Sequence, residues 1–432
     1  RRLNEHGKNA ILLETGEAGY SDTVQSAFTE MYGRGHYDGS YWPLHWVRAM
    51  GGTSAVWAGW CGALSERNLR NWPITRSDLD PFYKSAAGYL RRTEPFLTFS
   101  SAIAQGLTYR PMSTEEPLRL VQEPELYDAL PSVDIALGTT LSELHVKEGR
   151  REVEAISIYS LGGSVKRIDL RQGQAVVLAA GGIGNAQILL SSQPENGPAV
   201  GNENDQVGRY LMEHPHFIGC AKLITNDAFQ IPSRPPDFGE HVDIIEPDDE
   251  TYRRIGERDV SLELVPANLT ADDPVEALFS RKWGDSAKAY ILNARAEMEP
   301  EAENRLKLAE GADPASLKRL RAICHIGTSS FRTVDTFLEL LSDRLIASGS
   351  GRLRMANKEI MFGVSGGGHI MGTTRMGVSP RTSVVDADCK VHGYQNLFVA
   401  GSSVFATGGY ANPTLTLMAL AERLGEKLGA DK

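Results

Sequence analysis

The sequence predicts an α/β protein in which a second domain is inserted into one discontinuous α/β domain. The whole chain, with the inserted domain included, is of the α+β class. Two observations indicate this fold class. An apolar run, a glycine-rich turn and a helical pattern follow one another at residues 174–190, and the same order returns at residues 396–428. Between them, residues 214–365 are rich in proline and charge, which favours a separate and less regular domain.

The composition is that of an ordinary globular protein of 432 residues, long enough for two to three domains. Its net charge of −10 argues against nucleic acid as the main partner, because phosphate binding favours a basic face. No window offers the roughly 18 or more nearly uncharged apolar residues of a membrane span. The four cysteines are widely scattered, so neither a disulfide framework nor a metal knuckle is indicated.

The first residues are typical of the middle of a nucleotide-binding fold. Residues 1–6 are expected to end a helix that Gly7 stops, and residues 9–13 to form a short buried strand that leads into Glu14. An acidic residue at the end of a second strand is where a dinucleotide-binding fold holds the adenosine ribose. That fold also needs a glycine-rich turn about 20 residues earlier, which here would precede Arg1. Glu14 is therefore either a cofactor ligand or an ordinary strand ending.

If the N-terminus is missing, the lack of a recognisable signal peptide says little. The localisation is left unknown, with the cytoplasm favoured.

Local patterns predict the elements that follow. A loop rich in glycine and aromatic residues occupies residues 33–46, and Ser77 or Asp78 is expected to cap a helix that ends near residue 90. The apolar run at residues 174–180 predicts a strand buried on both faces. Further helices are expected near residues 333–345 and from Pro413 to about residue 428, because proline suits a first helical turn. Alternating patterns predict four strands, at residues 134–137, 143–146, 153–159 and 165–170.

Three segments carry residues suited to chemistry. Residues 48–59 combine three glycines with tryptophan, so their backbone could approach a flat ligand; an ordinary tight loop is the alternative. Residues 366–377 place His369 in a glycine-rich stretch, where it is either a general base or a satisfied core histidine. Residues 408–416 lie at a helix start, whose free N–H groups stabilise negative charge. Asn412 could equally be its N-cap.

The segment Met212-Glu-His-Pro-His216 invites a metal hypothesis. Two histidines and one carboxylate are too few ligands, and no second cluster lies near them in the sequence. We therefore predict no metal site.

Taken together, these segments resemble the glucose–methanol–choline (GMC) flavoprotein oxidoreductases. Gly51-Gly-Thr-Ser54 with Trp57 is similar to the family's flavin-contacting loop, and residues 179–190 are similar to its internal signature. Residues 208–216 also have a familiar pattern. Within the family, the arrangement is most similar to the pyranose 2-oxidase and glycoside 3-oxidase branch. The C-terminal motifs follow the family's order and spacing: His369-x-x-Gly372-Thr373, Val385-Asp386, Asn396 to Ser402, Asn412-Pro413-Thr414, and Ala419 to Arg423.

The resemblance implies a discontinuous Rossmann-like FAD-binding domain of the GMC and glutathione-reductase type, with an inserted substrate-binding domain that contains a mainly antiparallel sheet. Residues 1–70, 130–213 and 366–432 would form the FAD-binding domain, truncated at its N-terminus. Residues 71–129 and 214–365 would form the substrate-binding domain.

The resemblance also implies FAD as the cofactor. The pyranose 2-oxidase branch often has a histidine, covalently attached to FAD, before the tryptophan of the flavin loop. This chain has Val56 there, so we expect FAD to be held non-covalently. Without the glycine-rich turn, we expect this chain to bind FAD poorly. The expected FAD contacts are Glu14 at the adenosine ribose, the backbone near Leu141 at the adenine, and, around the flavin and pyrophosphate, Gly51, Gly52, Ser54, Trp57, Ala58, Gly59, Gly181, Gly401, Ser402, Asn412, Pro413 and Thr414.

The activity implied by the resemblance is oxidation of a CH–OH group, with a sugar or glycoside as the substrate. His369 would take the hydroxyl proton while the hydride moves to flavin N5. Asn412 would orient the hydroxyl, because an amide is no base near neutral pH. The electron acceptor would be dioxygen, a quinone or a redox protein. The protein could form a homo-oligomer.

Three alternatives stay open. A lyase on the same fold would hold FAD without redox turnover. A truncated, non-catalytic fragment would bind no flavin. An NAD-dependent dehydrogenase would explain Glu14 but none of the C-terminal motifs.

Overall fold

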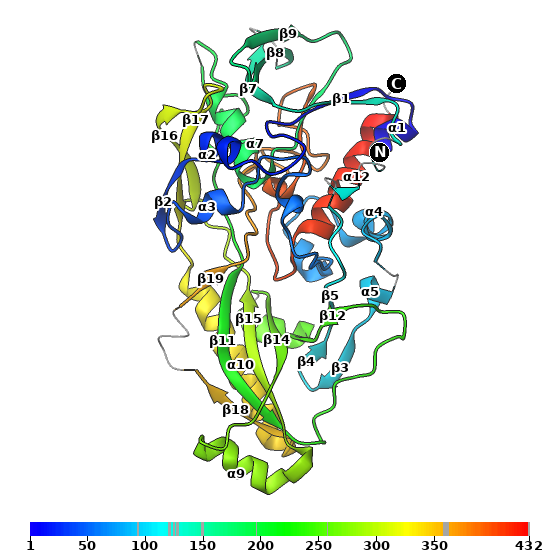
Figure 1. Cartoon of the computed structure of the whole chain (residues 1–432), viewed down its shortest axis with the longest axis vertical. Helices are drawn as coiled ribbons and strands as arrows, with labels where there is room; N and C mark the ends of the chain where they lie inside the picture. The colour runs from blue at the N-terminus through cyan, green and yellow to red at the C-terminus, as the bar shows by residue number, and fades with distance from the viewer. Residues whose placement is uncertain are drawn as a thin grey trace.

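The computed structural model describes residues 1–92, 95–119, 122, 123, 126, 129–147, 151–195, 197–256, 258–356 and 363–430. The molecule is elongated, with both chain ends in its upper part and one long sheet in its lower part (Figure 1). At the upper end, α1 (Arg2–Glu5) lies on the C-terminal helix α12 (Thr414–Ala430), where Arg2 pairs with Glu422 at 2.5 Å. Within the described residues, no helix is long and apolar enough to cross a membrane.

Short parallel strand pairs characterise the upper part. Strand β1 (Ala10–Leu13) pairs with β6 (Val133–Ala136), and β10 (Val176–Leu178) pairs with β20 (Leu397–Val399). An antiparallel sheet beside them consists of β7 (Thr139–Val146), β8 (Val153–Ser160) and β9 (Val165–Asp169), as the alternating patterns predict. These parallel pairs, with the helices around them, confirm the predicted mixed α/β class.

Two strands are less buried than the sequence predicts. In β1, Ile11 is 69% exposed and Leu12 is 41% exposed, and in β10 Val177 is 37% exposed. Each of the two strands has a single strand partner within the described chain, so one side of each stays open. An apolar run shows that a strand can be buried, but its neighbours decide whether it is.

The lower part is the mainly antiparallel sheet that was predicted. Its hydrogen-bonded order is β18-β11-β15-β14-β13-β4-β3, and β19 adds to β11. Helix α10 (Thr328–Ser348) packs on it through Val334, Phe337, Leu338, Leu341 and Leu345, whose spacing forms one helical face. The strands are β3 (Ser101–Ala104), β4 (Leu107–Tyr109), β11 (Pro215–Thr225), β13 (Ile244–Pro247), β14 (Val260–Ala267), β15 (Lys288–Ala296), β18 (Gly351–Met355) and β19 (Ser365–Gly366).

Two segments of the predicted second domain pack against the predicted first domain. Strand β17 (Lys318–Cys324) pairs antiparallel with β16 (Arg305–Ala312) and parallel with β2 (Met31–Gly35). Helix α4 (Arg76–Tyr89) packs on α12, where the hydroxyl groups of Tyr83 and Thr416 lie 2.8 Å apart. Where the two domains divide stays a prediction.

The cap of α4 differs from the prediction. Thr75 is the N-cap, and its side chain and that of Asp78 form a reciprocal capping box. The helix therefore begins before Ser77, and Asp78 is the third helical residue rather than the cap.

Shorter elements complete the described chain. They are α2 (Asp22–Phe28), α3 (Tyr41–Leu44), η1 (Gly52–Ala55), η2 (Glu66–Leu69), α5 (Pro95–Thr98), β5 (Met112–Ser113), α7 (Gly181–Ser191), β12 (His241–Val242), α8 (Asp249–Arg254), α9 (Pro274–Trp283), η4 (Gly284–Ser286) and η5 (Ser402–Val404).

Candidate active site

His369 and Asn412 meet although they come from segments 43 positions apart. The Nδ2 of Asn412 lies 2.9 Å from the Nε2 of His369. His369 follows β19, and Asn412 stands just before Pro413 and the first turn of α12. Among the described residues, the Oδ1 of Asn412 is buried and has no hydrogen-bond partner. An acceptor in that state is suited to a hydroxyl group of a ligand.

The glycines before His369 make room for aromatic rings. A Cβ on Gly367 would lie 2.5 Å from the Nδ1 of His369 itself. Gly368 has a φ of +72°, and a Cβ there would lie 2.5 Å from the Nδ1 of His45. A side chain at Gly367 would displace His369, and one at Gly368 would displace His45.

A buried carboxylate holds the same loop from behind. Glu213 accepts hydrogen bonds from the backbone N–H of His369 at 2.8 and 2.9 Å, and from the N–H of His214 at 2.6 Å. The N–H of Gly367, at 3.3 Å, and the hydroxyl of Tyr41 also donate to it. Burial raises the pKa of Glu213, while these hydrogen bonds act in the opposite direction.

Two further histidines surround His369. The Nδ1 of His214 lies 3.0 Å from the Nδ1 of His369, and the rings meet edge to face at 71°. The ring centroid of His216 is 6.0 Å from that of His369. Burial lowers the pKa of His214 to about 4 and that of His216 to about 3. Burial also lowers the pKa of His369 well below its ordinary value, with smaller effects from His214, His216 and Arg295. The cluster is therefore neutral near pH 7.

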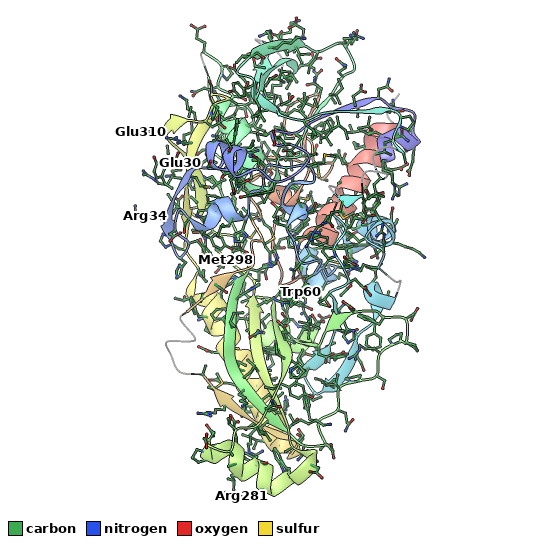
Figure 2. The ribbon with its side chains drawn as sticks, viewed as in Figure 1. Glu30, Arg34, Trp60, Arg281, Met298 and Glu310 are labelled. Carbon is green, nitrogen blue, oxygen red and sulfur yellow. The ribbon has the colours of Figure 1, made fainter. Side chains whose placement is uncertain are left out.

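The three histidines lie where the long sheet meets the upper part of the molecule. His216 and Arg295 are cross-strand partners in β11 and β15. The Arg295 guanidinium lies 4.7 Å from the Trp60 ring centre, and the Glu213 N–H donates to the Met298 sulfur at 3.4 Å. Figure 2 shows Trp60 and Met298 near the middle of the long axis.

Two further glycine turns lie beside each other, one between β10 and α7 and one between β20 and η5. Gly181, with a φ of +76°, and Gly401, with a φ of +109°, face each other, since a Cβ on Gly401 would lie 4.0 Å from the Cα of Gly181. Asn185 donates from Nδ2 to the carbonyl of Ala400 at 2.9 Å and accepts the N–H of Ala180 at 2.7 Å. These turns therefore expose backbone rather than side chains.

Ser402 connects that turn to the histidine loop. Its hydroxyl donates to the carbonyl of Ile370 at 2.7 Å. Gly182 also lies against Ile370, because a Cβ on Gly182 would lie 2.4 Å from that carbonyl oxygen. The structure thus brings Gly181, Gly401, Ser402 and the segment that contains His369 together.

Residues 300–421 match the GMC oxidoreductase family. This match lies in the C-terminal part of the chain, and similarity to curated relatives extends over more of it. It is 26% identical over 295 residues to the fructose dehydrogenase large subunit of Gluconobacter japonicus, covering 65% of this chain and 51% of that protein. It is 26% identical over 334 residues to 2-methyl-1,2-propanediol dehydrogenase of Mycolicibacterium austroafricanum, covering 68% and 54%. A shorter match to pyranose 2-oxidase of Tricholoma matsutake is 45% identical over 53 residues, covering 12% and 9%.

Two solved structures are similar to this chain in fold. Pyridoxine 4-oxidase from Mesorbium loti superposes with a TM-score of 0.57 at 15% identity, covering 97% of this chain and 99% of that one. Formate oxidase from Aspergillus oryzae RIB40 gives 0.59 at 12% identity, covering 99% and 95%. The chain spans about half the length of the first curated relatives it matches.

FAD is the cofactor of GMC oxidoreductases, and the backbone of the predicted flavin loop fits a flat group. Gly51 and Gly52 have φ values of +87° and +57°, and a Cβ on Gly52 would meet nothing closer than 3.9 Å. Ser54 donates to the carbonyl of Gly51 at 2.6 Å, which closes the turn. Bare backbone in left-handed turns allows the close approach that a ring system needs.

The rest of the predicted flavin loop contacts the segment around residues 115–118. Trp57 donates from Nε1 to the carbonyl of Leu118 at 3.0 Å. Gly59, with a φ of +80°, lies against Glu115, because a Cβ there would be 2.4 Å from its carbonyl oxygen. Val56 is 52% exposed, and Ala58 lies between Trp57 and Gly59.

Glu14 lies at the end of β1, as predicted, and its carboxylate accepts the N–H of Gly16 at 2.7 Å. Its own carbonyl accepts the N–H of Thr139 at 2.8 Å, so β7, which contains Leu141, begins beside it. Burial raises the pKa of Glu14, and Arg48 opposes that shift. Arg48 is buried, with its guanidinium 4.1 Å from the Trp46 ring centre.

The N-terminus of α12 supplies donors next to His369 and Asn412. Pro413 has no N–H, and its carbonyl accepts the N–H of Leu417 at 2.9 Å. The N–H groups of Thr414 and the two residues after it precede that bond, so they have no intrahelical acceptor. Such a terminus stabilises negative charge on a ligand.

Sequence reasoning missed Glu213, His214, Tyr41 and Asn185 as parts of this site. The signal for the first two was present in Met212–His216, which was weighed as a metal motif and, within residues 208–216, as part of the family resemblance, without a role for either side chain. Among the described residues, no group of three or more potential ligand side chains could hold a metal ion. The acidic residue of that motif instead accepts backbone N–H groups, which spacing in the sequence does not reveal.

Proposed function

We propose that this protein is an FAD-dependent oxidoreductase that oxidises a CH–OH group to a carbonyl group. The observation that supports this most is the contact between the Nε2 of His369 and the amide of Asn412. The low pKa of His369 keeps its ring neutral near pH 7. One side chain can take a proton, and the other can only orient. That division of roles suits removal of the hydroxyl proton from an alcohol.

In the proposed reaction, the alcohol loses a proton and a hydride. His369 accepts the hydroxyl proton at Nε2, and Asn412 hydrogen-bonds to the same hydroxyl group and holds it in place. FAD, when bound, supplies the acceptor for the hydride. Positive charge on His369 after proton uptake and the N-terminus of α12 both favour the negative charge that accompanies flavin reduction.

The FAD-binding residues follow from the same placement. Glu14 would accept hydrogen bonds from the adenosine ribose, and the backbone at Leu141 would hold the adenine. The bare turns described above would hold the flavin and the pyrophosphate. Because Val56 has no nucleophilic atom, we propose that FAD is held non-covalently.

A sugar or glycoside is the proposed substrate class. Fructose dehydrogenase and pyranose 2-oxidase, two of the relatives, are named for sugars, and 2-methyl-1,2-propanediol dehydrogenase is named for a small diol. The electron acceptor, by the same proposal, is dioxygen, a quinone or a redox protein.

The test uses the full-length protein with FAD bound. Anaerobic mixing with sugars, glycosides and simple alcohols should bleach the visible flavin bands and yield a carbonyl product. His369→Ala should keep FAD but slow flavin reduction by about 10²–10⁴-fold, the usual contribution of a general base. His392→Ala is the matched control, because that histidine bonds Ser383 at 2.8 Å outside the site. Reduction of the His369 variant at the parent rate would show that His369 is not the base. A parent protein that no alcohol bleaches would overturn the oxidoreductase proposal and favour a lyase.

A further inference from the structure

His214 is fully buried beside His369, and the reaction proposed above gives it no role. It stands between Glu213, which holds the histidine loop, and Pro215, which begins β11. Each ring nitrogen of His214 has a hydrogen-bond partner: Nδ1 faces the Nδ1 of His369, and Nε2 faces the carbonyl oxygen of Gly408. A histidine placed in this way joins the two segments that contribute the catalytic pair.

We propose that His214 is a positioning residue that fixes the tautomer of His369, so that Nε2 of His369 is free to accept the substrate proton. This inference rests on the proposed function and assigns a role to a side chain that touches neither substrate nor cofactor. The inference also states which ring nitrogens of His214 and His369 carry protons, and that statement can be tested without the reaction.

The argument begins at Gly408, because a carbonyl oxygen can only accept a hydrogen bond. The Nε2 of His214, 3.2 Å from that oxygen, therefore carries the proton of its ring. A neutral imidazole has a single N–H, so the Nδ1 of His214 is an acceptor. The Nδ1 of His369, 3.0 Å away, must then be the donor. This leaves the Nε2 of His369 without a proton.

The opposite arrangement fails at the carbonyl group. If His369 carried its proton on Nε2, its bare Nδ1 would need a donor from His214. The Nε2 of His214 would then be bare as well and would face the Gly408 oxygen at 3.2 Å, placing two acceptors against each other. Buried polar groups that face each other without a shared proton destabilise the arrangement, because neither has water to replace the lost hydrogen bond.

Asn412 agrees with this order. Its amide donates from Nδ2 to the bare Nε2 of His369 at 2.9 Å, and its Oδ1 lacks a partner within the described chain. A substrate hydroxyl inserted between the two side chains would donate to Nε2 and accept from Nδ2. After proton transfer, His369 holds a proton on each nitrogen, and its Nδ1–H still donates to His214. The hydrogen bonds of His214 are therefore the same before and after the transfer.

Burial is the main cause that lowers the pKa of both His214 and His369, so both rings are neutral at rest, and nearby charges act in the same direction on His369. Arg295 and the histidines His45 and His216 all disfavour a positive charge on His369. Arg295 is itself paired with Glu263 at 2.9 Å. Glu213, the nearby carboxylate, directs its oxygens at backbone N–H groups and Tyr41, not at either ring among the contacts of the described residues.

A structural role for His214 makes different predictions, so two substitutions are compared in the FAD-bound, full-length protein. His214→Phe fills a similar volume but offers His369 no acceptor. His214→Asn is smaller but keeps an oxygen acceptor near the position of Nδ1. If His214 serves only packing, Phe should be the milder change. If it fixes the tautomer, Asn should be the milder one.

The first measurement is the ¹⁵N NMR spectrum of histidine-labelled protein, with His369 assigned by its loss in His369→Gln. The parent should show a protonated Nδ1 and a bare Nε2 on His369. His214→Phe should gain the tautomer with a protonated Nε2, and His214→Asn should keep the parent pattern. A protonated Nε2 in the parent overturns the inference. This measurement needs no substrate, so it stands even if no alcohol reduces the flavin and the proposed function fails.

The second measurement is the rate of flavin reduction against substrate concentration and pH. His214→Phe should lower the limiting rate by about tenfold or more with little change in apparent substrate affinity, as expected when a general base has the wrong tautomer. His214→Asn should recover most of that loss, and the control His392→Asn should keep the parent rate. Equal losses in the Phe and Asn variants, or a parent rate in His214→Phe, would overturn the inference. If the Phe variant fails to fold, the parent spectrum and the Asn variant still decide it.

Discussion

The carboxylate of Glu213 accepts the backbone N–H of His369 with both of its oxygens, at 2.8 and 2.9 Å. The residue before His214 thus fixes the main chain of His369, while His214 meets its ring. One short segment, at the entrance to β11, therefore controls both the place and the orientation of the candidate base. Glu213 has no exposed surface, so any donor it loses has no water to replace it.

Glu213→Gln should destabilise the protein by about 1–3 kcal/mol, because the new amide N–H₂ faces donors that need an acceptor. Chemical unfolding of the parent and the variant at one pH measures the difference. Tyr41→Phe is the comparison, since it removes one donor to Glu213 and the hydroxyl that accepts the N–H of Gly368 at 3.0 Å, at about 1 kcal/mol for each hydrogen bond, while leaving the carboxylate in place. A Glu213→Gln variant as stable as the parent would mean that the carboxylate does not hold the loop.

The sequence predicted this site unevenly, for physical reasons. His369 and Asn412 were identified because each stands in a motif with family spacing, and the structure places them in contact. Glu213 and His214 were seen as a metal motif, because residue type suggests ligands but does not show which atoms face them. The contact between His214 and Gly408 joins positions 194 apart, and only the fold brings them together.

The fold was predictable where a pattern is local and less so where burial depends on neighbours. Apolar and polar residues alternate in β7, β8 and β9, and that alternation was sufficient to predict these strands. The helix α10 was also predicted, although it extends further in both directions than residues 333–345. Ile11 and Val177 are apolar but exposed, since their strands each have one partner among the described elements. The cap at Thr75 was missed because Ser77 and Asp78 are equally good capping residue types.

Asn412→Asp should move the pH dependence of flavin reduction upward. In the parent, the pKa of His369 lies well below 6.5, so the base is neutral and the rate should not depend on this group above pH 6.5. A carboxylate 2.9 Å from Nε2 would stabilise the imidazolium and raise that pKa. The variant should therefore lose rate near neutral pH and regain it as the pH rises.

Anaerobic flavin reduction, measured across pH with one substrate, follows this shift. Asn412→Ala is the control, because it removes the amide without adding charge and should keep the limb of the profile at low pH. If the rate of flavin reduction in the parent fell as the pH was lowered towards 6.5, His369 would not be neutral in that range, and the prediction would be contradicted.

Glu297 should make stability depend on pH over a defined window. It is buried, and its carboxylate accepts the N–H of Gly409 at 3.2 Å and of Asp259 at 3.0 Å. Burial, with the nearby charge of Asp259, raises the pKa of Glu297 from 4.5 to about 7. A raised pKa in the folded state means that the folded protein binds the proton more tightly than the unfolded chain. The stability contributed is therefore complete below pH 4.5 and is lost as the pH rises to about 7.

Glu297→Gln removes this titration while keeping the volume. Parent and variant should be unfolded with denaturant at several pH values, and the difference in their free energies of unfolding isolates Glu297 from the other groups. That difference should change between pH 4.5 and 7 by up to about 1.4 kcal/mol per pH unit and stay constant outside the window. A constant difference throughout would show that the pKa is ordinary.

Denaturation should release all of the FAD from the full-length protein. Val56 occupies the position at which the pyranose 2-oxidase branch often has a histidine bound to the cofactor, and valine offers no atom for such a bond. After acid precipitation, we expect the yellow flavin in the supernatant and none with the protein pellet. Val56→His is the informative comparison, because its imidazole would stand on a half-exposed position of the flavin loop. Flavin in the parent pellet would show attachment through another side chain. The backbone at Gly51 and Gly52 would then position the ring system, but a covalent bond would also hold it. That bond would need a nucleophilic side chain other than residue 56.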